Sequence, residues 1–530
     1  MITSSNNETN GRLGNILFRT ASLIGISNKC NNKLILPKSK YVEYFISDLF
    51  EGTIEELNCT FKYLSESDFH YTKELYDIES YENVNINGYL QSKKYWEQCE
   101  ELVKNTFKFN DDFICSVIGK CKSNIFDKET IAIHIRRGDY IGNNNYVQLE
   151  ISYYILALFE NFTNWRSYNI IIFSDDISYC KVHFDCIPNV YFSENNSDIE
   201  DLCLMSQCNH FIISNSTFSW WGAYLGSKKN SKVIRPNYLF NGELLKKNNF
   251  KDFYLPEWIN FDHNNENGED KKIDLNDVSF QIPVRFDSQD RRENLDLCIS
   301  IIKKYFDTEI IVYEQGDTLG DCHFKYLEKD VIFKYDTMGG IFHRTKMLNE
   351  MALMTNKKYI FNWDADVIVS PLQIFETVTQ LRNGADMCYP YKWAFALLDR
   401  NIWYNKLLGT LDIGVVGNTV FPGMYSTSPI SVGGAVGFNR ESFIKGGMEN
   451  ENYISYSCED VERKMRFEKL GYRVERTLGN NLYHVNHWIG INSSVQNPYF
   501  LSGNNEYDKE VRMNIEEFKE YIKSFRWGLK

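Results

Sequence analysis

Short apolar runs alternate with amphipathic stretches along both halves of this 530-residue chain. In the first half, the runs at residues 130–134, 169–174 and 210–214 predict short buried strands. In the second half, residues 280–286 and 309–314 predict strands. Between them, apolar side chains recur at helical spacing, at Leu295, Cys298, Ile299, Ile302 and Phe306. Strand, helix and strand in this order are typical of parallel βαβ units, so the pattern predicts an α/β fold in both halves.

A polar stretch separates the two halves. Residues 263–277 are rich in Asn, Asp, Glu and Lys, which predicts a linker or a long surface loop. We therefore divide the chain into a first domain at residues 1–260, a linker at 261–277, a second domain at 278–500 and a C-terminal tail at 501–530. The tail begins polar and ends in a helix-like stretch at residues 511–525.

Charge and cysteine content exclude some classes of protein. The net charge is −13 and no long Lys/Arg run is present, so we expect no nucleic-acid partner. The 13 cysteines form no CxxC pairs and have no zinc-site spacing, which predicts isolated core thiols. We find no signal-peptide pattern and no apolar run of about 18 residues, so we expect no membrane span.

The residues that follow each strand carry the candidate chemistry, because ligands of open α/β sheets bind beyond the carboxyl ends of the strands. After the first strand come Arg136 and Arg137, two adjacent cations. A diphosphate would offset their repulsion, since guanidinium groups make bidentate, charge-assisted hydrogen bonds to phosphate. The alternative is a surface ion pair with Asp139.

The third strand leads into the sequence SNSTFSWWG at residues 214–222. Ser and Thr cap helices well, and a helix start offers free N–H groups to an anion, so this run fits a phosphate cradle. The alternative is an ordinary capped helix with its tryptophans in the core, which we prefer for Trp220 and Trp221. Asp201 begins an apolar-rich helix; it either accepts hydrogen bonds from guanine or is a plain acidic residue of a first helical turn.

In the first half, the motifs GRLGN (11–15), HIRRGDY (134–140), FSDD (173–176) and SNSTFSWWGAYL (214–225) resemble those of the α-1,2-fucosyltransferases, over roughly residues 8–240. The resemblance implies a GT-B-like fold with two facing Rossmann-type lobes, GDP-fucose as donor, inversion at the anomeric carbon and no metal. It implies donor contacts from His134, Arg136, Arg137, Asp201, Ser216, Thr217, Phe218 and Ser219. Arg136 would hold the β-phosphate, and His134 and Asp201 would face the guanine.

The general base of that half stays open, because Asp139 is a candidate base and is equally suited to an ion pair with Arg136 or Arg137. The family has a polar residue and an aromatic residue where this chain has Ile16 and Thr20. That departure leaves the acceptor of the first half open.

In the second half, Asp364 and Asp366 follow a buried apolar run at residues 359–363. Two carboxylates at this spacing repel each other, and a bound Mn²⁺ or Mg²⁺ that bridges to a diphosphate relieves the repulsion. A lone DxD pattern is also common on surfaces. Glu459 and Asp460 stand 94 positions after the DxD pattern (460 − 366), where they are either catalytic or a capping acidic cluster on a helix.

Residues 282–295, 313–319, 342–351, 361–366 and 432–448, together with Glu459 and Asp460, resemble the β-1,4-galactosyltransferases and related GT-A enzymes, over roughly residues 278–490. The resemblance implies one Rossmann-like sheet, a UDP-sugar donor and inversion. It implies donor contacts from Arg285, Asp287, Arg291, Arg344, Asp364, Asp366, Gly433 and Gly434. Asp366, Asp364 and one histidine, His487 or else His484, would bind the metal.

By the same resemblance, Asp460 is the general base that takes the acceptor hydroxyl proton, and Glu459 orients an acceptor hydroxyl. The Trp- and Gly-rich stretch that the family has before its acidic cluster is absent here. The transferred sugar is therefore open among galactose, glucose, GlcNAc and GalNAc.

We expect a bifunctional glycosyltransferase that acts on a glycan or glycoprotein acceptor. The alternative is one catalytic half joined to a glycan-binding or scaffolding module. An oxidoreductase is disfavoured because no GxGxxG follows a strand. The lack of a signal or anchor pattern leads us to expect a cytoplasmic, intracellular protein from a bacterial, viral or cytosolic glycosylation system.

Overall fold

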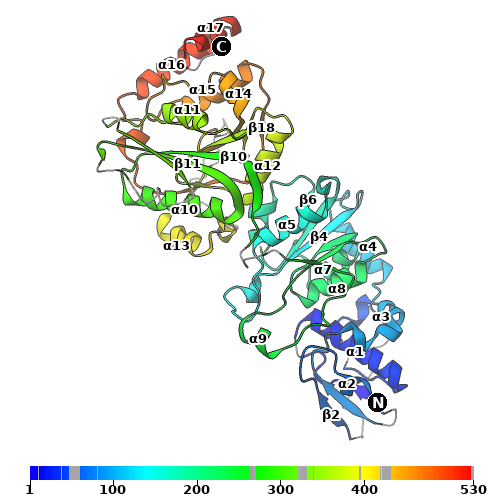
Figure 1. Ribbon diagram of the computed structural model, residues 1–530. Coiled ribbons are helices and arrows are strands. Elements are labelled where there is room, and N and C mark those ends of the chain that lie inside the picture. The colour runs from blue at the N-terminus through cyan, green and yellow to red at the C-terminus, as the bar shows by residue number, and fades with distance from the viewer. Residues whose placement is uncertain are drawn as a thin grey trace. The chain divides into compact units, whose positions relative to one another are not determined.

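The computed structural model describes residues 1–9, 11–37, 39–46, 60–79, 82–262, 264, 270–319, 322, 331–337, 340–392, 395–417, 419 and 431–526. The chain divides into two compact units. Unit 1 comprises residues 1–177 and 189–270, and unit 2 comprises residues 178–188 and 271–530. Figure 1 shows both units as mixtures of helices and strands, as the alternating pattern predicts.

Unit 1 is built on a fully parallel sheet whose described strands lie in the order β6-β5-β4-β7-β8-β9. The strands are β4 (Thr130–Ile135), β5 (Asn169–Ser174), β6 (Val190–Phe192), β7 (His210–Ile212), β8 (Val233–Pro236) and β9 (Ile259–Phe261). The strand order reverses between β4 and β7. In open α/β sheets that reversal opens a crevice at the carboxyl ends of the two strands, where ligands bind.

The helices of this sheet are α4 (Asp111–Gly119), α5 (Ile151–Asn161), α7 (Asp198–Ser206), α8 (Thr217–Gly226) and α9 (Gly242–Lys247). Helix α6 (Ile177–Phe184) follows β5, but all of it after Ile177 belongs to unit 2. A smaller parallel sheet, in the order β1-β3-β2, precedes them with β1 (Ile2–Thr3), β2 (Lys62–Ser65) and β3 (Val84–Asn87). Its helices are α1 (Leu13–Cys30), α2 (Lys73–Tyr76) and α3 (Glu100–Thr106). The implied arrangement of two facing lobes stays a prediction.

Aromatic rings fill the core between α1 and α8. Trp220 and Trp221 are fully buried, and the ring of Trp221 stacks on Trp96 with 5.9 Å between centroids. The ring centroid of Phe18, on α1, lies 4.5 Å from that of Trp220. The two tryptophans therefore serve the core, as we preferred from the sequence.

Unit 2 is built on a mixed sheet in the order β12-β11-β10-β13-β17-β15-β18, as far as its described residues extend. Its strands are β10 (Ile273–Val284), β11 (Phe306–Gly316), β12 (Ile332–Thr337), β13 (Tyr359–Trp363), β15 (Met387–Tyr389), β17 (Ala435–Asn439) and β18 (Val474–Arg476). Strands β12, β11, β10 and β13 are parallel, and β17 is antiparallel to its neighbours. The order again reverses beside the first strand, between β10 and β13.

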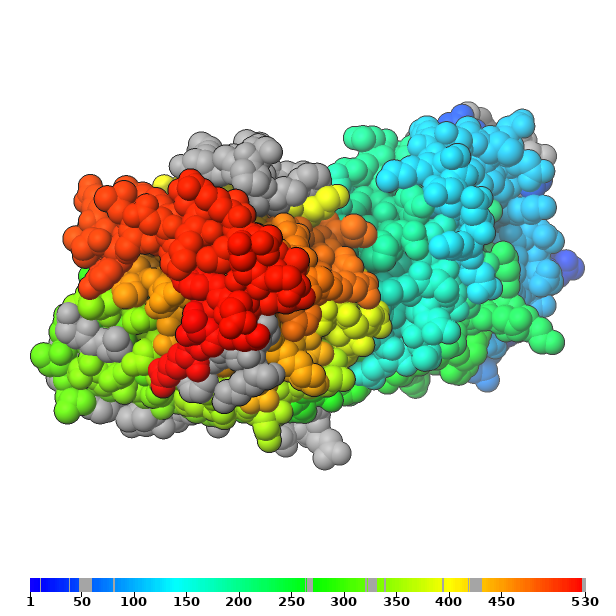
Figure 2. All heavy atoms as spheres, turned by 90° about the horizontal axis from the view of Figure 1, so that it is seen from above, coloured from blue at the N-terminus to red at the C-terminus, as the bar shows by residue number. Residues whose placement is uncertain are grey.

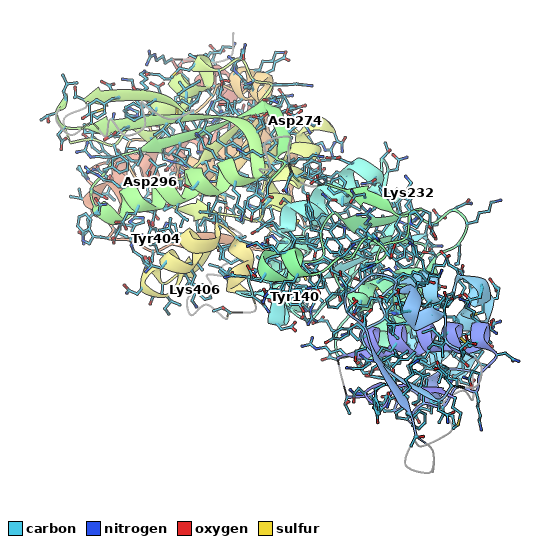
Figure 3. The ribbon with its side chains drawn as sticks, turned by 60° about the horizontal axis from the view of Figure 1, so that its bottom comes forward. Tyr140, Lys232, Asp274, Asp296, Tyr404 and Lys406 are labelled. Atoms are coloured by element: carbon cyan, nitrogen blue, oxygen red, sulfur yellow. The ribbon has the colours of Figure 1, made fainter. Side chains whose placement is uncertain are left out.

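The helices of unit 2 are α10 (Gln289–Tyr305), α11 (Arg344–Met354), α12 (Pro371–Arg382), α13 (Arg400–Thr410), α14 (Arg440–Lys445), α15 (Glu459–Lys469), α16 (Phe500–Arg512) and α17 (Ile515–Lys523). Figure 1 shows α10 and α13 on one face of the sheet and α11, α14 and α15 on the other. Figure 3 labels Asp296 on α10 and Tyr404 on α13, which are close enough to interact electrostatically. A second, small sheet orders β14 (Val367–Ile368), β19 (Leu482–Val485) and β16 (Phe395–Leu398).

Several boundaries differ from those expected. Phe306, which we assigned to the helix, begins β11 directly after α10 ends at Tyr305. The expected linker runs into β10, because Ile273 and Leu275 alternate with exposed residues and are buried. Residues 263 and 265–269 of that linker lie outside the described residues.

Residues 178–188, from the first half of the sequence, belong to unit 2. There the buried His183 binds Ser370 through Nδ1, at 3.0 Å, and Asp412 through Nε2, at 2.9 Å. Tyr179 donates its hydroxyl to the same carboxylate at 2.7 Å. The hydrogen bonds of this segment therefore depend on residues that follow it by more than 180 positions.

The expected tail forms part of unit 2. In place of one helix at residues 511–525 there are two, α16 and α17, because Asn514 caps α17 with a capping box. Phe518 and Ile522 of α17 are fully buried, and Lys469 of α15 donates to the carbonyls of Glu510 and Met513. In Figure 2 the red C-terminal residues cover one face of unit 2.

We predict that Phe518→Ala destabilises unit 2 by about 3–5 kcal/mol, since it removes a buried ring and leaves a cavity. Urea-dependent hydrogen exchange of peptides from α15, read by mass spectrometry, measures the loss. Val511→Ala on α16 is the control, because that side chain is 49% exposed. Equal exchange in both variants would show that the tail does not stabilise the unit.

Candidate functional site

The carboxyl ends of β4 and β7 bring several predicted residues of unit 1 together. His134 is buried at the end of β4, and its Nδ1 lies 2.7 Å from the hydroxyl of Ser214, which follows β7. Ser219 on α8 contacts the same hydroxyl at 3.4 Å. Burial, with a smaller effect from the Arg136 cation, lowers the pKa of His134 to about 3, so its imidazole is neutral at pH 7.

Arg136 lies beside this group and is already paired. Its guanidinium forms ion pairs with Asp139 and, at 2.8 Å, with Asp175, the residue that follows β5. Arg137 pairs with Asp176 at 3.2 Å. The ion pair that we weighed against phosphate binding is therefore present, and an anionic ligand would have to compete with it.

The start of α8 forms the other side of the same edge. Ser216 is the N-cap and accepts a hydrogen bond from the backbone N–H of Phe218 at 3.3 Å. A Cβ on Gly14, in the GRLGN motif, would lie 2.6 Å from Thr217 and 2.7 Å from the Phe218 nitrogen. The glycine is therefore required for the start of α1 to approach the start of α8.

Asp201 lies apart from this group. Its carboxylate accepts from Ser193 at 2.6 Å and from Asn196 at 3.1 Å, residues that follow β6. Burial raises its pKa, although these two donors oppose the effect. Within the described part of the chain, the structure does not bring Asp201 into hydrogen-bond contact with His134.

Unit 2 contains a cavity of about 950 Å³ at the carboxyl ends of β10 and β13. Of the predicted residues, Arg285, Arg291, Arg344, Asp364, Asp366, Gly433, Gly434, Glu459, Asp460, His484 and His487 line it. Segments more than 200 positions apart in the sequence therefore meet around one space. Asp287 lies just behind the wall, where it accepts a hydrogen bond from Arg291 at 3.0 Å.

Arg344 connects the two acidic groups of the cavity. It donates to Asp364 at 2.8 Å and to Asp460 at 3.2 Å, and it lies 3.5 Å from Glu459. Burial by itself lowers the pKa of Arg344, but the three carboxylates outweigh burial and raise it. This cation holds together two carboxylate pairs that would otherwise repel each other across a buried space.

Asp366 faces two imidazoles. His487 Nε2 lies 2.8 Å from its Oδ2, and His484 Nε2 lies 3.3 Å from its Oδ1. One ligand atom from each of the three residues falls within 4.8 Å of the other two, which fits a divalent ion with mixed oxygen and nitrogen ligands. The other ring nitrogen of His487 contacts the carbonyl of Trp488, which orients the ring.

Asp364 differs from Asp366 in its surroundings. Burial raises the pKa of Asp364 in spite of Arg344, whereas His484, His487 and Arg291 outweigh burial and hold the pKa of Asp366 well below its ordinary value. Asp366 is therefore the carboxylate of the pair that stays ionised, as a metal ligand must.

Glu459 and Asp460, which begin α15, line the same cavity. Burial raises the pKa of Asp460, but Arg344 and Arg463 outweigh it, so the pKa lies below the ordinary value. Burial and the charge of Asp460 raise the pKa of Glu459 to about 8. Neighbouring carboxyl groups whose pKa values are driven apart are typical of sites that move protons.

Sequence reasoning missed a group behind Asp460. Arg463, fully buried on α15, donates to Asp460 at 2.8 Å and to Glu449 at 2.7 Å. Asn362 of β13 donates to the same Glu449 oxygen at 2.8 Å. Arg463 follows Asp460 by three positions on a helix, a spacing that could have indicated the contact; nothing in the sequence pairs Glu449 with either.

Gly433 and Gly434 line the cavity beside Asp460. A Cβ on Gly433 would lie 2.7 Å from Asp460 Oδ2, and Gly434 has a φ of +80°, which favours glycine. Tyr391, also missed, donates its hydroxyl to the Gly433 carbonyl at 2.7 Å. Arg285, which also lines the cavity, pairs with Asp317 at 2.7 Å.

Unit 1 is thus an open parallel α/β sheet with arginines and a helix start where its strand order reverses. The family model for glycosyl transferase family 11 matches residues 3–262, and the chain belongs to that family.

The O-antigen biosynthesis glycosyltransferase WbnK of Escherichia coli is 30% identical to this chain over 227 residues, which span 41% of this chain and 72% of the relative. An alpha-1,2-colitosyltransferase of Escherichia coli is 31% identical over 177 residues, 31% of this chain and 58% of the relative. A galactoside 2-alpha-L-fucosyltransferase of Caenorhabditis elegans is 24% identical over 272 residues, which span 46% of this chain and 76% of the relative.

Two solved structures are also similar. Fucosyltransferase NodZ from Bradyrhizobium matches 42% of this chain and 91% of its own, with 13% identity and a TM-score of 0.30. The catalytic domain of Drosophila beta1,4galactosyltransferase 7, in complex with xylobiose, matches 40% of this chain and 71% of its own, with 16% identity and a TM-score of 0.24. The likeness of the second half to β-1,4-galactosyltransferases stays a prediction. No helix in the described part of the chain is both long and apolar enough to span a membrane.

We predict that Glu459→Gln becomes increasingly stabilising, relative to the unmodified protein, as pH rises from 4.5 to about 8. A carboxyl group whose folded pKa is raised to about 8 contributes stability at pH 4 that is lost as it ionises. Urea unfolding of both proteins across this range measures the difference, with Glu441→Gln, an exposed residue of α14, as the control. A difference that does not change with pH would contradict the raised pKa.

Proposed function

We propose that the protein is a bifunctional glycosyltransferase. Unit 1 transfers fucose from GDP-fucose to a glycan hydroxyl, with inversion and without a metal. Unit 2 transfers a hexose, of the galactose type, from a UDP-sugar with the help of Mn²⁺ or Mg²⁺. The acceptor is a glycan or a glycoprotein.

For unit 1, membership of family 11 supports a glycosyltransferase, and the names of two relatives support fucose or colitose as the sugar. As the sugar leaves, negative charge builds on the diphosphate of GDP. The Arg136 guanidinium and the N–H groups that begin α8 stabilise that charge, once the diphosphate has taken the place of Asp139 or Asp175 beside Arg136. Neutral His134 offers a hydrogen bond without adding charge.

For unit 2, one observation carries the proposal. The DxD carboxylates, two imidazoles and the acidic pair that begins α15 converge on a single cavity of about 950 Å³. Asp366, His484 and His487 would hold the metal, which supplies a Lewis acid for the diphosphate of the donor. Arg344 adds a second positive charge beside it.

Asp460 takes the proton of the acceptor hydroxyl as that oxygen attacks the anomeric carbon. Its low pKa keeps it ionised at pH 7, and Arg463 and Gly433 fix its position. Glu459, protonated over much of the neutral range, can donate a hydrogen bond to an acceptor oxygen. In this proposal Asp460 accepts the proton, and Glu459 donates a hydrogen bond to the acceptor.

A second candidate is favoured by the ion pairs of Arg136. Because Asp139 and Asp175 already neutralise this arginine, unit 1 could bind glycan without turning over a donor, and only unit 2 would be catalytic. Measuring the release of GDP and of UDP from their sugar donors decides between the two candidate functions.

We predict GDP-fucose turnover that survives EDTA and UDP-sugar turnover that does not. Arg136→Ala lowers only the first activity and Asp366→Ala only the second, each by about 100-fold or more, since each removes charge stabilisation of a leaving diphosphate. Release of GDP and UDP from a panel of GDP- and UDP-sugars, GDP-colitose included, measures both. Each variant is the control for the other.

The outcomes separate the candidates. UDP release without GDP release would leave unit 2 as the catalytic half. Loss of both activities in EDTA would contradict the division between an arginine-based site and a metal-based site.

We predict that Asp460→Asn lowers the kcat of UDP-sugar transfer by about 100- to 10,000-fold, because the acceptor proton loses its base. UDP and Mn²⁺ should still bind, which isothermal titration calorimetry measures. Glu441→Gln serves as the control. A kcat within tenfold of the unmodified protein would assign the base elsewhere.

A further inference from the structure

The cavity of unit 2 extends beyond the residues that the proposed transfer uses. Val461, Lys464, Met465 and Glu468 line it from α15. Their spacing places them on one face of the helix, and from the first to the last the helix rises by about 10 Å. The cavity therefore continues past Asp460 as a groove along α15, which we call the α15 groove.

The second wall of the α15 groove comes from the C-terminal residues. Tyr507 of α16 lines the cavity together with Tyr456 and Ser457. A Cβ on Gly503 of α16 would lie 2.5 Å from the Ser457 side chain, so the helix approaches that segment closely. Asn504 accepts a hydrogen bond from the thiol of Cys458 at 3.0 Å.

Buried polar contacts fix this wall. Glu510 of α16 has no exposed surface, accepts from Asn450 at 2.7 Å and accepts the hydroxyl of Tyr453 at 3.2 Å. Burial and the nearby Glu462 and Glu506 raise the pKa of Glu510 to about 9, so this buried carboxyl is neutral at pH 7 and leaves no uncompensated charge in the wall. The groove is thus part of the folded unit and does not depend on a loose tail.

Half-exposed apolar side chains belong to both walls of the groove. Tyr456 is 47% exposed and Val461 41%, and both line the cavity. The ring of Tyr456 lies parallel to that of Phe500, with 6.1 Å between centroids. Apolar side chains half exposed beside a reactive site are typical of ligand binding.

The polar side chains of the groove come from α15. Lys464 and Glu468, paired at 2.7 Å, border the face of α15. A pyranose ring matches this surface, because its C–H face is apolar and its hydroxyl groups lie around the edge.

We infer that the α15 groove binds the sugar that precedes the accepting sugar, so that unit 2 acts on an oligosaccharide or a glycoside and not on a free monosaccharide. The inference rests on the proposed hexosyl transfer by unit 2, and it adds a subsite formed by Val461 and Tyr507. The accepting hydroxyl lies at Asp460, and the rest of the glycan follows α15.

The test compares a methyl glycoside of one sugar with the methyl glycoside of a disaccharide that carries the same sugar at its non-reducing end. For the full-length protein with Mn²⁺ and its UDP-sugar, we expect the disaccharide to have a KM about tenfold lower or more. Tyr507→Ala and Val461→Ser should each remove most of that advantage. Val511→Ala, on α16 but outside the cavity, should retain it.

The results distinguish the inference from the function on which it rests. If the unmodified protein releases no UDP from any UDP-sugar, even by transfer to water, the proposed function fails. If it releases UDP but treats the two glycosides alike, or if both groove variants keep the advantage, the α15 groove is not a sugar subsite. Circular dichroism confirms that each variant is folded, and Val461→Ser, at a half-exposed position, guards against misfolding of the Tyr507 variant.

Discussion

Repulsion between buried carboxylates is the constraint around which unit 2 is organised. Asp364, Asp366, Glu459 and Asp460 face one cavity, and none could remain ionised there without compensation. Arg344 compensates Asp364 and Asp460, Arg463 compensates Asp460 from behind, and the imidazoles compensate Asp366. Burial and the charge of Asp460 outweigh Arg344 at Glu459, and the pKa of Glu459 rises to about 8. The distinct properties of the four acids therefore follow from where the cations lie.

The donor sites proposed for the two units differ in the charge that the protein presents to the diphosphate. In the larger sheet of each unit, the strand order reverses beside the strand that comes first in the sequence. The reversal lies between β4 and β7 in unit 1 and between β10 and β13 in unit 2. At that edge unit 1 presents Arg136 and a helix start, whereas unit 2 presents carboxylates and imidazoles. A guanidinium can bind a diphosphate directly, but a carboxylate can do so only through a cation. The proposed difference in metal dependence follows from this exchange of charge at equivalent places in two sheets.

Much of the fold could be predicted because buried strands are short and continuously apolar. Residues 169–174 and 359–363 were expected as strands and form β5 and β13 with those bounds. Phe306 was misassigned because an apolar residue that follows a helix directly satisfies the helical spacing and also begins a strand. The transfer of residues 178–188 to unit 2 could not be foreseen, since it depends on hydrogen bonds from His183 to Ser370 and Asp412. No periodicity encodes a partner so distant in the sequence.

The candidate site could be predicted only in part, for a related reason. Motifs identify residues that face a ligand, such as Asp366 and Asp460, but not the residues that support them. Glu449 illustrates the gap: it lies before α15 in an unremarkable acidic and amide-rich segment, yet it binds both Arg463 and Asn362. Because Arg463 is fully buried between Glu449 and Asp460, loss of either acid would leave its charge only partly compensated, at a cost of several kcal/mol. Asp460 and its support are therefore coupled: the position of Asp460 at the cavity wall depends on an ion pair that reaches, through Asn362, into the strand that precedes the DxD carboxylates.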